Sequence, residues 1–139
     1  MSSILLSDSL SVTGLFGILA EMKNICRRSG RSTRTLRSYC LWADGFSDMA
    51  MTEEGRRNFA QSCLDAVGKY GLDGIDIDWE YPGTSLAGIG SHVNDKENYT
   101  LLLKALRESL NHMEGEKSLS VAVGGDVYFA LQTDMKAAS

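Results

Sequence analysis

The ten residues Asp73–Pro82, DGIDIDWEYP, constrain the fold of this chain more than any other stretch. Carboxylates and large apolar side chains alternate along it. The acidic positions are Asp76, Asp78 and Glu80, and the apolar positions are Ile75, Ile77 and Trp79. Successive side chains of a β-strand point to opposite faces. The pattern therefore predicts a strand with one apolar face and one face that carries three carboxylates, about 6–7 Å apart.

A helical pattern precedes this strand. Thr52 can cap a helix, and apolar residues then recur at helical spacing as far as Tyr70. Gly71 is placed to end the helix. The predicted apolar stripe is Phe59, Cys63, Val67 and Tyr70, broadened by Ala60, Leu64 and Ala66.

A second helical pattern and a second strand follow. The helix is expected to begin near Asn94, whose spacing to Glu97 is that of a capping box. Its apolar stripe is Leu102, Leu106, Leu110 and Met113. Residues 118–125, SLSVAVGG, read as the next buried strand. Helices that alternate with strands in this way predict an α/β fold with a parallel sheet.

The three carboxylates need an explanation, because a parallel strand covered by helices is buried on both faces. The apolar row suits the face that packs on helices, so the acidic row must face a barrel interior or a cleft. Close like charges cannot all ionise easily, so we expect the pKa of one carboxyl to rise. A carboxyl that stays protonated near neutral pH is what a general acid needs.

Two other interpretations of the acidic row are weaker. Alternating acids could hold Ca²⁺ or Mg²⁺, but an extended strand points only one row of oxygens at an ion. The row could also be the wet face of an edge strand, but the apolar row and the flanking helices argue against that.

The same residues carry a family resemblance. DGIDIDWEYPG resembles the DxxDxDxE signature of glycoside hydrolase family 18, the chitinase family, with Asp73, Asp76, Asp78 and Glu80 at the acidic positions. The similarity extends over roughly residues 42–139. The flanking helical segments resemble the third and fourth helices of that family, and LSVAVGGDVYF resembles its fifth strand. The resemblance implies a partial (β/α)₈ TIM barrel, incomplete at both ends, that spans about the third to fifth βα units.

The resemblance also implies a reaction, namely retaining hydrolysis of β-1,4-linked N-acetylglucosamine polymers. Glu80 matches the general acid that protonates the glycosidic oxygen. Asp78 matches the residue that orients the substrate's N-acetyl group, which itself acts as nucleophile. Asp76 lies deeper and is expected to tune the charge of Asp78, and Tyr81 is expected to contact the sugar. Asp73 is off the acidic parity and is expected to be structural.

The other expectations from the resemblance concern partners and location. Chitin or a chitooligosaccharide is the expected substrate, and no metal or organic cofactor is implied. Neither a nucleic-acid partner nor a membrane is expected, and the oligomeric state stays open. An extracellular location is implied, although no signal peptide is visible in the sequence. Trp79 is expected to be core packing. Two non-chitinase interpretations stay open, a non-catalytic chitin-binding remnant and an endo-β-N-acetylglucosaminidase.

The sequence also departs from the family pattern. The sixth-strand Met-x-Tyr-Asp motif and the late tryptophan of the family are absent, so weak or no activity is expected. The place of the third strand reads Ser38–Trp42, without the family's Ser-x-Gly-Gly.

Residues 1–41 are the predicted unmatched N-terminal segment, ahead of a catalytic region over residues 42–139. Residues 1–40 carry a net charge of +4, from six basic and two acidic residues, whereas the remainder carries −8. Arginine recurs every third residue between Arg28 and Arg37, which fits either a basic arm for nucleic acid or GC-rich DNA read out of frame. A shifted frame over residues 37–43 can encode Val-Leu-Leu-Ser-Val-Gly, which looks like the missing third strand. We favour the frameshift, because the arginines are not interleaved with aromatic residues that stack on bases.

Overall fold

The computed structural model describes residues 25–29, 35–41, 45–86, 88–125, 127, 131, 133–134 and 136. Four strands form one sheet in chain order: β1 (Ile25–Ser29), β2 (Thr35–Leu41), β3 (Gly74–Ile77) and β4 (Ser118–Val121). The helices are α2 (Phe46–Ala50), α3 (Glu53–Tyr70) and α4 (Asp95–Asn111).

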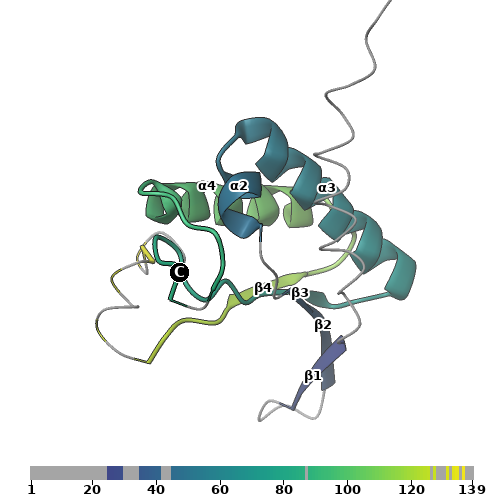
Figure 1. Ribbon diagram of the computed structural model, residues 1–139. Helices are drawn as coiled ribbons and strands as arrows, with labels where there is room; N and C mark the ends of the chain where they lie inside the picture. The colour runs from purple at the N-terminus through teal and green to yellow at the C-terminus, as the bar shows by residue number, and fades with distance from the viewer. Residues whose placement is uncertain are drawn as a thin grey trace, which may run out of the picture.

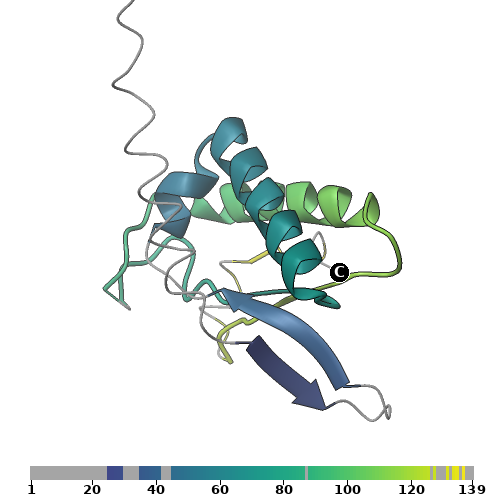
Figure 2. The same ribbon diagram turned by 90° about the vertical axis from the view of Figure 1, so that its right-hand side faces the viewer.

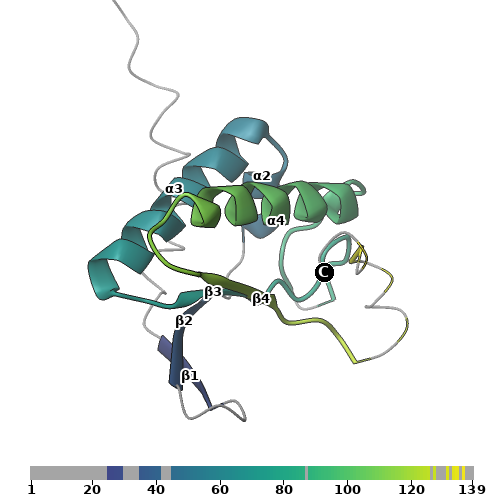
Figure 3. The same cartoon turned by 180° about the vertical axis from the view of Figure 1, so that it is seen from behind.

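The elements form two layers. Helices α2, α3 and α4 lie together on one side of strands β3 and β4 (Figures 1 and 3), and the β1–β2 pair extends away from these helices (Figure 2). Among the described residues, no helix combines the length and hydropathy that a bilayer span requires.

The sheet confirms the predicted α/β class. Strands β2, β3 and β4 run parallel, with Ser38 opposite Gly74 and Gly74 opposite Ser118. The predicted position of the third strand, Ser38–Trp42, falls on β2 as far as Leu41, and Trp42 lies outside the described residues. Strand β1 is antiparallel to β2, which departs from the all-parallel pattern of a barrel. Most of the predicted N-terminal segment lies outside the described residues.

Helix α3 begins and ends where its sequence predicts. Thr52 is extended and its side chain accepts a hydrogen bond from the Gly55 N–H at 3.0 Å, while Gly71 adopts the left-handed conformation with a φ of 59°. The buried residues of this helix are Phe59, Ala60, Cys63, Ala66 and Val67. The prediction was wrong for Tyr70, which is 45% exposed in the last turn, where the helix has passed the edge of the core.

Helix α4 begins one residue after Asn94, as predicted, but its capping box is not formed. Asn94 makes no side-chain cap hydrogen bond, and its φ of −95° and ψ of 9° are not the extended values usual for an N-cap residue. The carboxylate of Asp95 instead accepts the N–H of His92 at 2.8 Å. The predicted stripe is buried at Leu102, Leu106 and Leu110.

Strands β3 and β4 are both shorter than the sequence predicts. Regular pairing in β3 stops at Ile77, so only Asp76 of the acidic row lies on the strand itself. β4 stops at Val121 and its residues are half-buried, which corrects the prediction of a buried strand over residues 118–125. Gly74 is required where the strands meet, because a Cβ there would lie 2.2 Å from the Ser118 carbonyl oxygen.

The apolar row of the signature lies in the core, as predicted. Ile75 and Ile77 have no exposed surface and Trp79 is 1% exposed. The Trp79 ring stacks on Phe46 with centroids 5.5 Å apart, and meets the edge of Tyr99 at 5.1 Å. This confirms Trp79 as core packing. Cys63, also in this core, is a free and buried thiol.

Candidate active site

The acidic row lies at the carboxyl end of β3. Asp76 is the third of the four strand residues, and Asp78 and Glu80 follow in the segment that leaves the strand. In open or closed parallel sheets this end of a strand carries the binding and catalytic residues. The fold therefore places the predicted acids at the end of the sheet where catalytic residues are usually found.

Asp76 is the buried end of the row. Its side chain is 7% exposed, and Ser120 of β4 donates a hydrogen bond from Oγ to Asp76 Oδ1 at 2.5 Å. This hydrogen bond fixes the position of the Asp76 side chain, which is close enough to Asp78 for its charge to raise the pKa of Asp78.

Asp78 is the carboxyl of the acidic row whose pKa is shifted. Burial, then the negative charges of Glu80 and Asp76, raise the pKa of Asp78 above the ordinary aspartate value. Its Oδ1 is buried and has no hydrogen-bond partner within the part of the chain that the structure describes. The expected rise in one pKa of the row is therefore present, and it falls on Asp78.

Glu80 and Tyr81 are half-buried in the segment after β3. The charge of Glu80 acts on Asp78, so the acids at the mouth of the row are electrostatically coupled. The peptide bond between Glu80 and Tyr81 is cis. Beyond it, the N–H of Thr84 donates to the carbonyl of Tyr81 at 3.3 Å, which closes a turn over Pro82 and Gly83.

Asp73 has a different position, as its parity predicts. Its backbone carbonyl accepts hydrogen bonds from the Ser118 N–H at 2.9 Å and from Ser118 Oγ at 3.3 Å. These bonds join the starts of β3 and β4. Within the described ranges, no cluster of three or more His, Cys, Asp or Glu side chains has the arrangement of a metal site.

Tyr99 lies behind the acidic row and was not among the predicted site residues. Its hydroxyl and the Trp79 Nε1 are buried without a hydrogen-bond partner among the described residues. Burial, then the charges of Asp78 and Asp76, raise the pKa of Tyr99. Its hydroxyl therefore stays protonated and can donate or accept a hydrogen bond.

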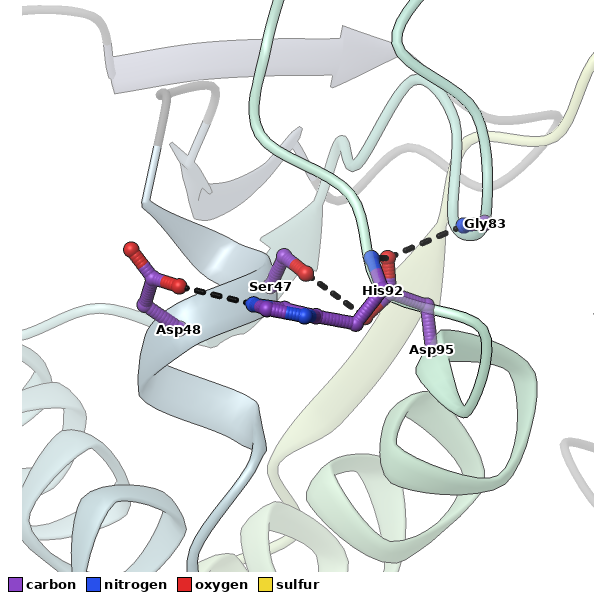
Figure 4. A network of polar contacts seen from close by, with 5 residues as sticks. All are labelled: Ser47, Asp48, Gly83, His92 and Asp95. Carbon is purple, nitrogen blue, oxygen red and sulfur yellow. Dashed lines mark hydrogen bonds and ion pairs between the residues drawn. The ribbon is translucent and has the colours of Figure 1, made fainter.

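A buried carboxylate that the sequence reasoning missed, Asp95, lies beside the site. Asp95 is fully buried and joins Ser47, Gly83 and His92 in one polar network (Figure 4). The signal for it was a Pro-Gly turn directly after the acidic row and an aspartate at a predicted helix start.

Known proteins resemble this chain at the level of sequence and fold. Residues 3–139 match the glycosyl hydrolases family 18. The chain belongs to this family. Chitinase A1 of Niallia circulans is 41% identical over 99 residues, which cover 68% of the chain and 14% of that protein. Chitotriosidase-1 of Mus musculus is 34% identical over 66% of the chain and 20% of its own length.

Solved structures agree. A family 18 N-acetylglucosaminidase from Paenibacillus barengoltzii has a TM-score of 0.69 at 40% identity, over 73% of this chain and 32% of that one. A multi-modular, cell-surface-expressed chitinase from a Paenibacillus strain has a TM-score of 0.70 at 32% identity, over 99% of this chain and 17% of that one. The family resemblance of the acidic signature is thereby confirmed.

The matches also show how much of each relative's length this chain covers. The chain spans about one seventh of the Niallia circulans chitinase and one fifth of the mouse chitotriosidase. The family match begins at residue 3 and includes most of the basic N-terminal segment. The boundary at residue 41, and the frameshift hypothesis, stay predictions.

Proposed function

We propose that this chain carries the acidic row of a chitinase-type hydrolase, which cleaves β-1,4 linkages between N-acetylglucosamine units of chitin or a chitooligosaccharide. The observation that carries the proposal is the coupled row at the end of β3, in which Asp78 has a raised pKa and a buried oxygen that lacks a partner among the described residues. The names of its relatives, several of them chitinases, support the substrate class.

The proposed reaction assigns one role to each acid. Glu80 donates a proton to the glycosidic oxygen as the bond to the anomeric carbon breaks. The carbonyl oxygen of the substrate's own N-acetyl group forms the new bond to that carbon and closes an oxazolinium ring. Glu80, now ionised, takes a proton from water, whose oxygen opens the ring and restores the original anomeric configuration.

Asp78 and Asp76 act on the ring-closing step. Asp78 is proposed to accept a hydrogen bond from the acetamido N–H, and negative charge on its carboxyl group stabilises the positive oxazolinium. Asp76, held by Ser120, supplies the charge that keeps a proton shared within the row. Tyr81, next to the acid, is proposed to contact the sugar.

The architecture that we propose for the region is a partial (β/α)₈ barrel. Three parallel strands with helices on one side, and the TM-scores to family 18 structures, support it. Strand β4 is half-buried and pairs with no further strand among the described residues, so the 139 residues expressed alone are expected to hydrolyse slowly. An extracellular site of action is proposed, supported by the similarity to the cell-surface-expressed Paenibacillus chitinase.

The test is hydrolysis of a chitooligosaccharide by the wild-type chain and by Glu80→Gln. Loss of general acid catalysis is expected to lower turnover by about 10²–10⁴-fold, with little change in melting temperature because Glu80 is half-buried. Glu116→Gln, which removes an exposed carboxylate before β4, is the matched control and is expected to match wild type. Equal turnover in Glu80→Gln and wild type would remove Glu80 from the mechanism.

The N-acetylglucosaminidase neighbour favours a second activity on the same bond. Release of single N-acetylglucosamine units from the chain end needs the same acids, so the product pattern from a hexasaccharide separates the two activities. Only monosaccharide as the first product would identify end-directed cleavage. Retention on chitin without any product would instead identify the non-catalytic binding alternative, and cleavage of a glycoprotein N-glycan core would identify the endo-β-N-acetylglucosaminidase alternative.

A further inference from the structure

The loop that follows the acidic row is hydrogen-bonded at both ends to a single buried carboxylate, that of Asp95. We define the anchored loop as residues 83–92, which begin three positions after Glu80 and end before α4. The N–H of Gly83 and the N–H of His92 both donate to Asp95 Oδ2, at 3.0 and 2.8 Å. The two ends of the anchored loop therefore meet on one oxygen atom.

The other oxygen of Asp95 joins the loop to the helix layer. Ser47 of α2 donates from Oγ to Asp95 Oδ1 at 2.7 Å, and Figure 4 shows the carboxylate between α2, the loop and the start of α4. Asp95 has no exposed surface and Ser47 is 2% exposed. A buried carboxylate is costly unless it is fully hydrogen-bonded, and the positive end of α4 lowers that cost further.

We propose that Asp95 is a positioning residue that fixes the catalytic acid Glu80 through the anchored loop. The inference rests on the proposed function, because Glu80 is catalytic only there. Asp95 touches no reacting atom in this scheme. It acts by holding Gly83, and Gly83 limits where Glu80 can lie.

The link from Gly83 back to Glu80 is short and stiff. Pro82 is buried and its ring fixes φ, and Gly83 has a φ of 73°, the value of the third residue of a type II turn. The Thr84 N–H donates to the Tyr81 carbonyl and closes that turn. A displacement of Gly83 thus moves the turn as a unit, and Glu80 with it.

The residue on the other side of Glu80 is held by the same layer. Trp79 stacks on Phe46, which is the neighbour of Ser47 in α2. Helix α2 therefore contacts the chain on both sides of Glu80. Phe46 packs on Trp79 before it, and Ser47 is linked through Asp95 to Gly83 after it. Loss of the second link leaves the acid attached on one side only.

The chemistry of the carboxylate predicts graded effects of substitution. All three partners donate to it, which suits an ionised carboxylate, since that form only accepts. Asp95→Ala leaves two backbone N–H groups without an acceptor. In Asp95→Asn the amide oxygen can still accept from the loop and the amide nitrogen can donate to Ser47 Oγ, so the conservative variant is expected to restore most of the loop geometry.

The experiment compares wild type, Asp95→Ala and Asp95→Asn in the full chain by amide hydrogen exchange and by steady-state hydrolysis of a chitooligosaccharide. Asp95→Ala is expected to speed exchange at Gly83 and His92 and to lower kcat on the order of 10- to 100-fold with KM little changed, as for a displaced catalytic group. Asp95→Asn is expected to lie close to wild type in both measurements.

Two controls separate positioning from general loss of stability. Asp48→Asn alters the other carboxylate of Figure 4, whose side chain is 85% exposed and which contacts His92 Nε2 at 3.0 Å, and it is expected to leave the Gly83 exchange rate and kcat unchanged. Leu110→Ala removes a fully buried side chain at the far end of α4 and is expected to lower the melting temperature at least as much as Asp95→Ala, without its specific effect on kcat.

Two results would overturn the inference. Gly83 exchange in Asp95→Ala equal to wild type would show that Asp95 does not hold the loop. A kcat that falls in Leu110→Ala as far as in Asp95→Ala would reduce Asp95 to a structural role. If the wild-type chain and Glu80→Gln have equal turnover, the proposed function fails instead, and the exchange rates still report separately on whether Asp95 holds the loop.

Discussion

The odd and even positions of the segment 75–80 share one backbone but differ in burial and charge. The apolar side chains of the odd positions have at most 1% of their surface exposed and lie in the helix-covered core. The acidic side chains of the even positions crowd at the end of β3, where burial and mutual repulsion raise the pKa of Asp78. The segment formed by β3 and the residues that follow it therefore carries apolar core residues and acidic site residues at alternate positions.

The comparison shows how an unfavourable row of acids is tolerated. Close carboxylates cost free energy, and that cost must be offset by other contacts of the same segment. Trp79, between Phe46 and Tyr99, and the isoleucines supply apolar burial on the opposite face. Substitutions on the apolar face should therefore change stability first, and substitutions on the acidic face should change activity and its pH dependence.

The largest stability effect is expected on the apolar face. Trp79→Ala removes a 1% exposed ring that stacks on Phe46, and large-to-small changes of this kind cost about 3–5 kcal/mol in the free energy of unfolding. Urea denaturation measures this loss. Leu86→Ala is the matched control, since Leu86 is 74% exposed and its removal is expected to change stability by less than about 0.5 kcal/mol. Equal losses in both variants would contradict the division of the two faces.

Much of the fold could be predicted because its signals are local. Thr52 and Gly71 bound α3 by capping chemistry that depends on a few neighbouring residues. The strict alternation of residues 75–80 set the two faces correctly, since side-chain parity follows from the extended backbone alone. The candidate acids follow from the same alternation, together with the family signature.

The parts that could not be predicted depend on distant contacts. The role of Asp95 requires Ser47, which is 48 residues away in the chain, and Gly83 on the other side of a loop. The capping box at Asn94 is not formed because the backbone of Asn94, with φ −95° and ψ 9°, lacks the extended conformation of an N-cap residue. Helix α2, with only five residues, is too short to give a periodic signal.

A smaller effect is expected where the acidic face meets β4. Ser120→Ala removes the donor to Asp76 Oδ1 and leaves a 7% exposed carboxylate without this hydrogen bond, which costs about 1–3 kcal/mol in the free energy of unfolding at neutral pH. Ser62→Ala is the control, because that hydroxyl bonds to the Asn58 carbonyl on the exposed side of α3 and is expected to contribute almost nothing. Thermal unfolding of both variants checks the difference. A Ser120→Ala protein as stable as wild type would show that the bond does not stabilise Asp76.

The smallest effect, and the most specific, is expected from Asp78→Asn. Because the folded pKa of Asp78 is raised, the folded chain binds this proton more tightly than the unfolded chain does. The stability that Asp78 contributes is therefore fully present below the ordinary aspartate pKa of about 4, and it is lost as pH rises through the raised pKa. Above the raised pKa the ionised, partly buried carboxylate opposes folding, so Asp78→Asn is expected to be more stable than wild type there. The two proteins should converge as pH falls below about 4.

Chemical denaturation of both proteins across that pH range measures the difference, with Asp65→Asn, which alters an exposed carboxylate on α3, as the matched control. A variant that is less stable than wild type at neutral pH would mean that the charged form of Asp78 is stabilised in the fold. The acidic face would then not be a cost that the apolar face offsets. The expected result, a gain in stability together with a loss of hydrolysis, would show that this face is retained for its chemistry at the expense of stability.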